Sequence, residues 1–243
     1  MLFEVIYEDS DLLVINKPAG LVCHPTKSDE RSSLIGRVRL YLGNTEGRLI
    51  NRLDRETSGI VLVAKSRLVA GEVGKLLENN AIKKHYLAIV HGHLIEDRLI
   101  IDAALGRDLR SAVAIKDSVR PDGAAARTYI RARERFENGN GHFSLIEVRP
   151  CSGRKHQIRI HLAHIGHPIV GDKLYGADEK MYLRLVTGKL TEDDSQRLLL
   201  PNHALHAAWV MFRWREQEWD FHAEPTAEFK NFLGFDLCER SVI

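Results

Sequence analysis

The stretch NRLDRETSGIVLVA, residues 51–64, divides into a polar loop and an apolar strand. The polar part ends in Thr57, Ser58 and Gly59, residue types that hold tight turns through side-chain hydrogen bonds or backbone freedom. An uninterrupted apolar run follows, rich in β-branched residues as buried strands are. The sequence therefore predicts a buried strand with a tight polar loop at its start, and Asp54 lies in that loop.

Further strand patterns lie on both sides of this stretch. The other expected strands cover residues 2–7, 12–15, 85–91, 126–136 and 142–148. The last two are joined through Asn138-Gly139-Asn140-Gly141, which is a strong hairpin signal. Residues 157–161 continue the alternation and are also expected to form a strand.

The sequence also contains several helical patterns. A helix is expected from Leu68 to Leu77, with Ser66 as its N-cap. Three more are expected at residues 162–165, at 181–197 with an interruption at Gly188, and at 224–233. Together, these patterns predict an α+β fold, with a mixed, mainly antiparallel β-sheet and peripheral helices.

Length and composition favour a single domain. The chain has 243 residues, of which 44% are hydrophobic, and this is enough to bury a full core. It contains no internal repeat, low-complexity tract or obvious linker. We therefore expect one domain that covers residues 1–243.

The cysteines and the N-terminal residues bear on the cellular compartment. No signal or transit peptide is recognisable, and no apolar run approaches the length of a membrane span. Cys23, Cys151 and Cys238 are odd in number and far apart, which argues against a disulfide framework. We expect a cytoplasmic protein with no membrane partner.

The charge of the chain is unevenly distributed. The formal net charge of +2 is too small to indicate a nucleic-acid partner by itself. Between Ala104 and Arg135, however, eight basic residues stand against four acidic ones, and the C-terminal segment after Glu216 is acidic. An RNA-facing patch and an ordinary solvated surface are both consistent with this pattern.

Asp54 is the first candidate for catalysis. Arg52 and Arg55 lie close to it in sequence, and guanidinium groups would stabilise the ionised carboxylate and lower its pKa. A nucleophile or base needs such an ionised group. On local chemistry alone, an aspartate in such a turn is more often a surface ion pair or a turn cap. Both interpretations stay open at this point.

The segment GRKHQIRIH, residues 153–161, is the second candidate. Strand alternation would place Gln157, Arg159 and His161 on one face, which would line a polar cleft or form the solvated side of an edge strand. The histidines His156, His161, His164 and His167 match no established metal-ligand spacing, so we expect no metal there.

Tyr86 lies on an expected strand among basic neighbours. A tyrosine in such a place is usually half-buried packing. It could equally stack on a base or take part in proton transfer.

Read together, these segments resemble the RluA-type family of pseudouridine synthases. The family's H-R-L-D-x-x-T-S-G loop is matched by residues 51–59, except that Asn51 replaces the histidine and cannot carry charge. The other matching segments are residues 7–25, the strand of Tyr86, and residues 126–128, 153–161, 167–172 and 205–207. The resemblance covers most of the chain, and we expect no N-terminal S4-like RNA-binding domain of the kind that many relatives carry.

The resemblance implies a fold, an activity and roles for residues. The fold would be a bent, mixed sheet flanked by helices, and the activity would be the isomerisation of uridine to pseudouridine without a cofactor. Asp54 would be the catalytic carboxylate, Arg159 its counter-cation and Tyr86 the platform for the uracil. Arg52 would fill the vacated base stack.

The implied partner is a structured RNA, either rRNA or tRNA, bound by a monomer. Arg52 and Asn51 of the loop, together with Arg154, Lys155 and His156, are the expected RNA contacts. Two alternatives from other classes remain: a non-catalytic RNA-binding or chaperone protein on the same scaffold, and a metal-dependent hydrolase that uses the histidines.

Overall fold

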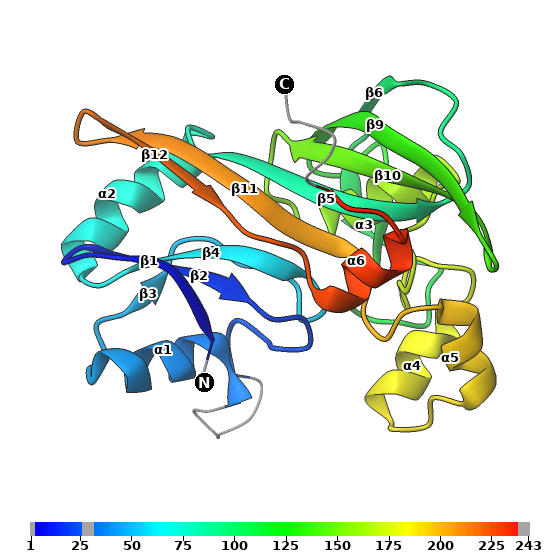
Figure 1. Ribbon diagram of the computed structural model, residues 1–243, viewed down its shortest axis with the longest axis horizontal. Helices are drawn as coiled ribbons and strands as arrows, with labels where there is room; N and C mark the ends of the chain where they lie inside the picture. Colours follow the sequence, from blue (N-terminus) through cyan, green and yellow to red (C-terminus); the bar gives the residue numbers. More distant parts are fainter. Residues whose placement is uncertain (1–2, 26–31, 238–243) are drawn as a thin grey trace. The chain divides into compact units, whose positions relative to one another are not determined.

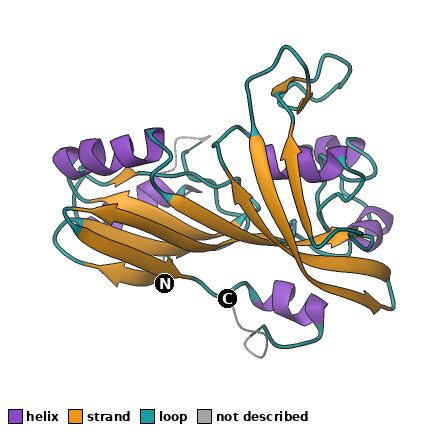
Figure 2. Ribbon diagram, turned by 90° about the horizontal axis from the view of Figure 1, so that it is seen from above, coloured by secondary structure: helices purple, strands orange, loops and turns teal. Residues whose placement is uncertain are grey.

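The chain forms two compact units. The computed structural model describes residues 3–25 and 32–237. Unit 1 contains the described residues of Met1–Tyr86 and His206–Thr226, and unit 2 contains those of Leu87–Leu205 and Ala227–Ile243. Each unit is a set of strands with helices beside them, coloured along the sequence in Figure 1 and by secondary structure in Figure 2.

Unit 1 is built on a mixed sheet. Its strands are β1 (Glu4–Glu8), β2 (Leu12–Lys17), β3 (Arg48–Leu49), β4 (Ser58–Ala64), most of β11 (Leu205–Trp214) and β12 (Gln217–His222). β1, β2 and β4 pair antiparallel in that order, and β3 also pairs antiparallel with β4. β4 pairs parallel with β11, which in turn pairs antiparallel with β12. The central position of β4 follows from its composition, because all seven of its residues are buried.

Two helices accompany this sheet, α1 (Leu34–Leu42) and α2 (Arg67–Glu78). The Ser66 side chain caps α2 by accepting a hydrogen bond from the amide of Val69, as the sequence predicts. Val69 and Val73 of α2 are buried in one core with residues of β2, β4 and β11. Amphipathic spacing thus fixes α2 against the strand that follows the Asp54 loop.

Unit 2 contains an antiparallel sheet and four short helices. Its elements are part of β5 (Lys83–His91), β6 (Arg98–Asp102), β7 (Leu105–Arg107), β8 (Asp117–Val119), β9 (Arg127–Asn138), β10 (Gly141–Pro150), α3 (Gln157–His164), α4 (Lys180–Val186), α5 (Glu192–Leu198) and α6 (Ala227–Leu233). β9 lies between β10 and β6, and β7 and β8 form a separate ribbon. The core around α3 includes Ile160, Leu105, Leu174 and Tyr175.

Most expected elements are confirmed. The β9–β10 hairpin turns where Asn138-Gly139-Asn140-Gly141 predicts it, and the helical segment with an interruption at Gly188 is resolved into α4 and α5. The α+β class with a mixed, mainly antiparallel sheet is therefore correct. The first residue of the expected strand at 2–7, Leu2, and the third cysteine, Cys238, lie outside the described residues. The prediction of a single domain over residues 1–243 stays a prediction, because a compact unit need not be an independent domain.

The strand expected at residues 157–161 is wrong, because this segment begins α3. His156 precedes the helix with a left-handed backbone, φ 54°. Gln157 to Leu162 are all buried, so both the apolar residues and the polar residues between them face protein. Residues 157–162 therefore have no solvated face to mark a helical period, and the apolar residues at every second position gave the pattern of a strand.

None of the helices formed by the described residues is long and apolar enough to span a membrane.

Candidate active site

Asp54 lies in the loop between β3 and β4 of unit 1 (Figure 1). Its carbonyl accepts a hydrogen bond from the amide of Thr57 at 3.2 Å, which closes the turn. Asp54 is partly exposed, whereas Leu53 before it and residues 56–60 after it are buried. Asp54 thus keeps some contact with solvent, although buried residues flank the Asp54–Arg55 pair on both sides.

Asn51 holds the start of this loop against β4. Its side-chain amide donates to the carbonyl of Ile60 at 3.1 Å, and its side-chain oxygen accepts from the amide of Leu62 at 2.8 Å. The side chain is buried. Asn51 therefore braces the loop, and a buried amide with both ends engaged is poorly placed to make the RNA contact expected of it.

Lys17 and Cys23 hold the middle of the loop. The fully buried ammonium group of Lys17 donates to the carbonyls of Pro18 and Leu21, both at 2.8 Å, and of Arg55 at 3.1 Å. The Cys23 thiol donates to the carbonyl of Leu53 at 3.3 Å, and the Leu53 amide lies 3.4 Å from the same sulfur. The residues on both sides of Asp54 are thus tied to the β2–α1 segment.

Ser58 and Gly59 fix the end of the loop against β11. The ring of His206 lies 2.8 Å from the Ser58 hydroxyl through Nδ1 and 3.0 Å from the Ala223 carbonyl through Nε2. Since a carbonyl only accepts, Nε2 of the neutral ring carries the proton and the Ser58 hydroxyl donates to Nδ1. Gly59 has φ +109°, and a Cβ there would lie 2.3 Å from the Ala207 carbonyl oxygen. Only glycine permits this close approach.

Charge around the loop acts on two buried groups. Burial lowers the pKa of Lys17 to about 8, even though the charges of Cys23 and Asp54 oppose this shift. Burial and the charge of Asp54 together raise the pKa of Tyr86 well above its ordinary value. Tyr86 is therefore a neutral phenol throughout the physiological range, buried in unit 1 within the electrostatic reach of Asp54.

The arginines of the loop are exposed. Arg55 lies 3.6 Å from the Glu56 carboxylate. Arg52 is also exposed. Burial, together with the charges of Arg52 and Arg39, lowers the pKa of His24. The positive charge that the sequence indicates next to Asp54 is thus on the surface.

Arg159 belongs to unit 2, on α3. Its guanidinium group is buried and binds the Asp172 carboxylate side-on, with Nε to Oδ2 at 2.7 Å and Nη2 to Oδ1 at 2.9 Å. The Tyr175 ring lies under it, 4.9 Å from the guanidinium carbon. Burial would raise the pKa of Asp172, but the charge and hydrogen bonds of Arg159 hold it far below its ordinary range. Such an ion pair locks the guanidinium in one orientation.

The remaining polar residues of α3 position the helix. The Gln157 side chain accepts from the Ser152 hydroxyl at 2.7 Å and donates to the carbonyl of Arg127 at 3.0 Å. His161 is bonded through both ring nitrogens, to Thr128 at 2.8 Å and to the Ala103 carbonyl at 2.9 Å. These two side chains tie α3 to β9 and to the β6–β7 turn, so their role is structural.

The residues expected to bind RNA on this segment lie just before α3. His156 Nδ1 is 2.9 Å from the Tyr175 hydroxyl, and the ammonium group of Lys155 is 2.8 Å from the Asp117 carboxylate. Arg154 donates to the Ala125 carbonyl at 3.3 Å. All three are held by contacts within unit 2, and Arg154 and Lys155 are exposed.

The structure thus divides the predicted site residues into two groups. Asn51, Arg52, Asp54 and Tyr86 belong to unit 1, whereas the Arg154–His156 turn and Arg159 belong to unit 2.

Several supporting residues were not identified from the sequence. Lys17 had a signal, because a lysine at the end of an apolar run needs buried partners. Asp172 lies in the matched segment 167–172, but the spacing of 13 residues from Arg159 crosses a turn that periodicity does not reveal. The Ser58–His206 contact spans 148 residues and has no local signal.

Comparison with known proteins identifies the family of this chain. The profile described as "RNA pseudouridylate synthase" matches residues 11–164. The protein named "Uncharacterized RNA pseudouridine synthase YlyB" of Bacillus subtilis is 34% identical over 180 residues, which are 71% of this chain and 57% of that protein. The "Ribosomal large subunit pseudouridine synthase D" of Nitrosomonas europaea is 34% identical over 210 residues, 84% of this chain and 56% of that protein. The chain therefore spans less than two thirds of the length of these relatives.

Two solved structures share the fold. "Human RNA Pseudouridylate Synthase Domain Containing 1" has a TM-score of 0.73 at 24% identity, covering 92% of this chain and 83% of that one. "Human RNA Pseudouridylate Synthase Domain Containing 4" has a TM-score of 0.71 at 23% identity, covering 95% of this chain and 92% of that one.

Proposed function

Since this chain belongs to the RNA pseudouridylate synthase family, as an RluA-type member, we propose that it isomerises uridine to pseudouridine in structured RNA. The reaction breaks the bond between ribose C1′ and uracil N1 and forms a bond between C1′ and C5. The C5 proton is lost and N1 gains one, so no cofactor is consumed.

Asp54 is the proposed catalytic carboxylate. The observation that carries this proposal is the contrast between the partly exposed Asp54 and the loop that holds it. Asn51, Lys17, Cys23 and the Ser58–Gly59 pair fix the loop at successive points. A group that must attack a sugar or base carbon has to be held within a fraction of an ångström, and such a loop supplies this.

Arg159 is proposed to be the counter-cation of Asp54 during the reaction. A guanidinium group has donors on more than one edge, and the pair with Asp172 occupies Nε and Nη2. Asp172 and the Tyr175 ring would hold Arg159 ready, so that no reorganisation is needed when the charge on Asp54 changes.

Tyr86 is proposed to lie against the uracil as a neutral aromatic ring. Its raised pKa supports this role over that of a phenolate base, because the hydroxyl stays protonated at physiological pH. A neutral phenol can stack on a base and still donate or relay a proton.

RNA binding is assigned to basic groups: the exposed Arg52 in the loop of unit 1, and the exposed Arg154 and Lys155 with the half-buried His156 before α3 in unit 2. Such contacts set affinity and its salt dependence, whereas the fold of the RNA selects the uridine. The relatives named for the ribosomal large subunit make rRNA the first substrate to test, and tRNA the second. We also propose that the protein is located in the cytoplasm and that it acts as a monomer.

The substrate is tested by mapping pseudouridines in rRNA and tRNA from cells with the gene, without it, and with the gene encoding Asp54→Asn. We expect a uridine that is modified only in the presence of the wild-type gene. An unchanged map, with normal RNA affinity of the purified protein, would instead support the non-catalytic RNA-binding alternative.

A further inference from the structure

A second group of chemistry-bearing side chains lies at the end of the β9–β10 hairpin in unit 2. Glu137 near the end of β9 and His142 at the start of β10 are cross-strand partners. His93 lies in the loop that follows β5. One possible ligand atom from each of the three side chains lies within 4.8 Å of the other two. Among the residues that the structure describes, no other group of this kind occurs.

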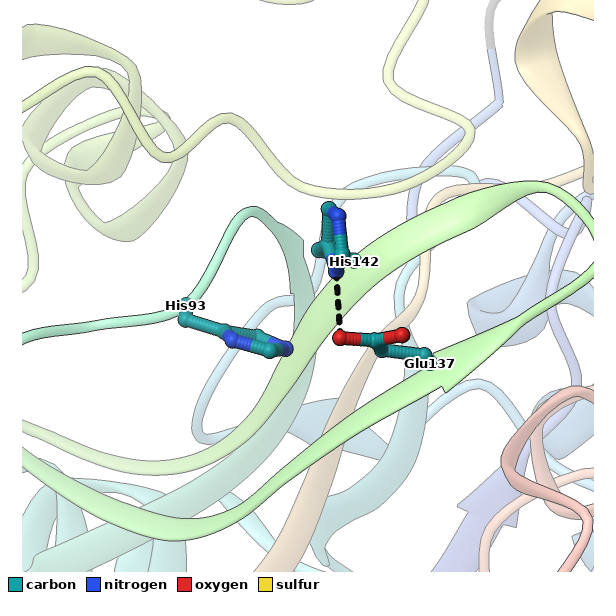
Figure 3. Close-up of side chains that lie close together, drawn as sticks. All are labelled: His93, Glu137 and His142. Carbon is teal, nitrogen blue, oxygen red and sulfur yellow. Dashed lines mark ion pairs between the residues drawn. The ribbon is translucent and has the colours of Figure 1, made fainter.

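The three side chains converge (Figure 3). His142 Nδ1 is 2.8 Å from Oε1 of Glu137, and the ring of His93 points toward the same carboxylate. The two imidazole rings have centroids 5.1 Å apart. His93 Nε2 also lies 3.2 Å from the main-chain oxygen of Phe136, which keeps the ring beside the strand that carries Glu137.

The hairpin strands that carry Glu137 and His142 are held in place by aromatic packing on their other face. Phe136 and Phe143 form the next cross-strand pair, and successive residues of a strand face opposite ways. Phe143 packs on Phe232 with centroids 5.0 Å apart, and Phe136 packs on Phe235 at 5.6 Å. The hairpin is therefore anchored through its aromatic face while Glu137 and His142 remain on the exposed face.

The loop that carries His93 is tied to β10 on both sides of that residue. The amide of Gly92 donates to the His142 carbonyl at 2.8 Å. The Ser144 hydroxyl donates to the Gly92 carbonyl and accepts from the Leu94 amide, both at 2.9 Å. All three side chains thus project from backbone segments that already hold one another.

We propose that His93, Glu137 and His142 bind a divalent transition-metal ion of the Zn²⁺ type. Two imidazoles and one carboxylate form a donor set that Zn²⁺ accepts, with water in the fourth position. Metal–ligand bonds of about 2.0–2.2 Å require tetrahedral donor atoms to lie roughly 3.4 Å apart. The three donor atoms lie within 4.8 Å of one another and His142 Nδ1 is 2.8 Å from Glu137 Oε1, so small rotations of these exposed side chains would bring the donors to that spacing.

The ion would link the loop after β5 to both strands of the hairpin. The proposed isomerisation uses no metal, so the ion would take no part in that reaction. It would instead stabilise this part of unit 2. Because only the native fold brings the three donors together, the metal stabilises the folded state by mass action.

The test uses untagged protein freed of metal by a chelator. Titration with Zn²⁺ by calorimetry, and with Co²⁺ by visible absorption, is expected to show one site per chain. His93→Gln, Glu137→Gln and His142→Gln should each weaken binding at least about tenfold. The His142 and Glu137 side chains are 64% and 63% exposed, so these variants should fold normally.

His222→Gln is the matched control. His222 Nε2 lies 3.1 Å from the Asp220 carboxylate, and both are exposed, so this pair resembles His142–Glu137 but belongs to no group of three. The control should bind like the wild type. Zn²⁺ should also raise the Tm of the wild type and leave that of the triple variant unchanged. The proposal is overturned if the wild type has no stoichiometric site, if His222→Gln weakens binding as much as the three variants do, or if the triple variant retains the affinity.

Discussion

At the scale of single residues, the Asp54 loop depends on buried polar side chains. Lys17 is the clearest case, because its ammonium group has three protons and donates to three carbonyls. One of these belongs to Arg55, the residue after Asp54. Lys17 is thus a positioning residue for the proposed catalytic group.

We predict that Lys17→Met impairs both stability and activity. The variant leaves buried carbonyls without a donor, which should cost about 2–4 kcal/mol of unfolding free energy. Loss of the Arg55 contact should also lower kcat by roughly 100-fold. Urea unfolding and steady-state kinetics measure the two effects, and Lys75→Met, at an exposed position of α2, serves as the control. Wild-type kcat in Lys17→Met would contradict the positioning role.

His206 gives a prediction for acid stability. Burial lowers its folded-state pKa from 6.5 to about 4, although the hydrogen bond to Ala223 opposes the shift. As the pH falls from 6.5 toward 4, the unfolded state therefore takes up the proton first, and the unfolding free energy decreases. The contribution is about 3 kcal/mol over that window.

His206→Gln should remove most of this pH dependence, and His222→Gln at an exposed position should not. The three tryptophans, Trp209, Trp214 and Trp219, all belong to unit 1, so tryptophan fluorescence follows the unfolding of that unit alone. Equal pH slopes in the wild type and His206→Gln would refute the assignment.

At the scale of elements, β4 and β11 are held together by a close backbone approach at Gly59. We predict that Gly59→Ala destabilises unit 1 by about 3–5 kcal/mol, because the added methyl group meets the Ala207 backbone and the residue has a positive φ. Gly71→Ala on α2 meets nothing within 4 Å and should stabilise by up to about 1 kcal/mol. Equal thermal stability of both variants would contradict this account.

Elements with a local signal could be predicted from the sequence, and elements without one could not. β4 and the β9–β10 hairpin have local signals, an apolar run and an Asn-Gly turn, and both are confirmed. α3 has apolar residues at every second position and polar residues satisfied by distant partners, so its pattern indicated a strand. β11 and β12 were not expected. They form a hairpin with each other, but β11 also pairs with β4, which lies far away in sequence, and tertiary contacts of this kind decide where such strands form.

The same contrast holds for the candidate site. Asp54, Arg159 and Tyr86 came from ordered motifs, whereas Asp172 and His206 became visible only with their partners. A supporting residue is defined by the group that it contacts, and that contact is set by the fold.

At the scale of the whole molecule, a net charge of +2 leaves the proposed RNA binding to local basic groups. We predict that Arg52→Gln lowers the slope of log affinity against log salt concentration by about 0.7–0.9. Arg67→Gln should leave the slope unchanged, because β4 separates Arg67 from the Asp54 loop by roughly 20 Å. Filter binding over a salt series measures both, and identical slopes for the two variants would contradict the assignment of Arg52.

The central claim is that Asp54 performs the chemistry in a pseudouridine synthase. Tritium release from [5-³H]uridine-labelled RNA tests it most directly, with the wild type and Asp54→Asn compared under single-turnover conditions and RNA affinity measured alongside. We predict release by the wild type and none by Asp54→Asn, which should still bind the RNA. Release by Asp54→Asn at the wild-type rate would contradict the claim.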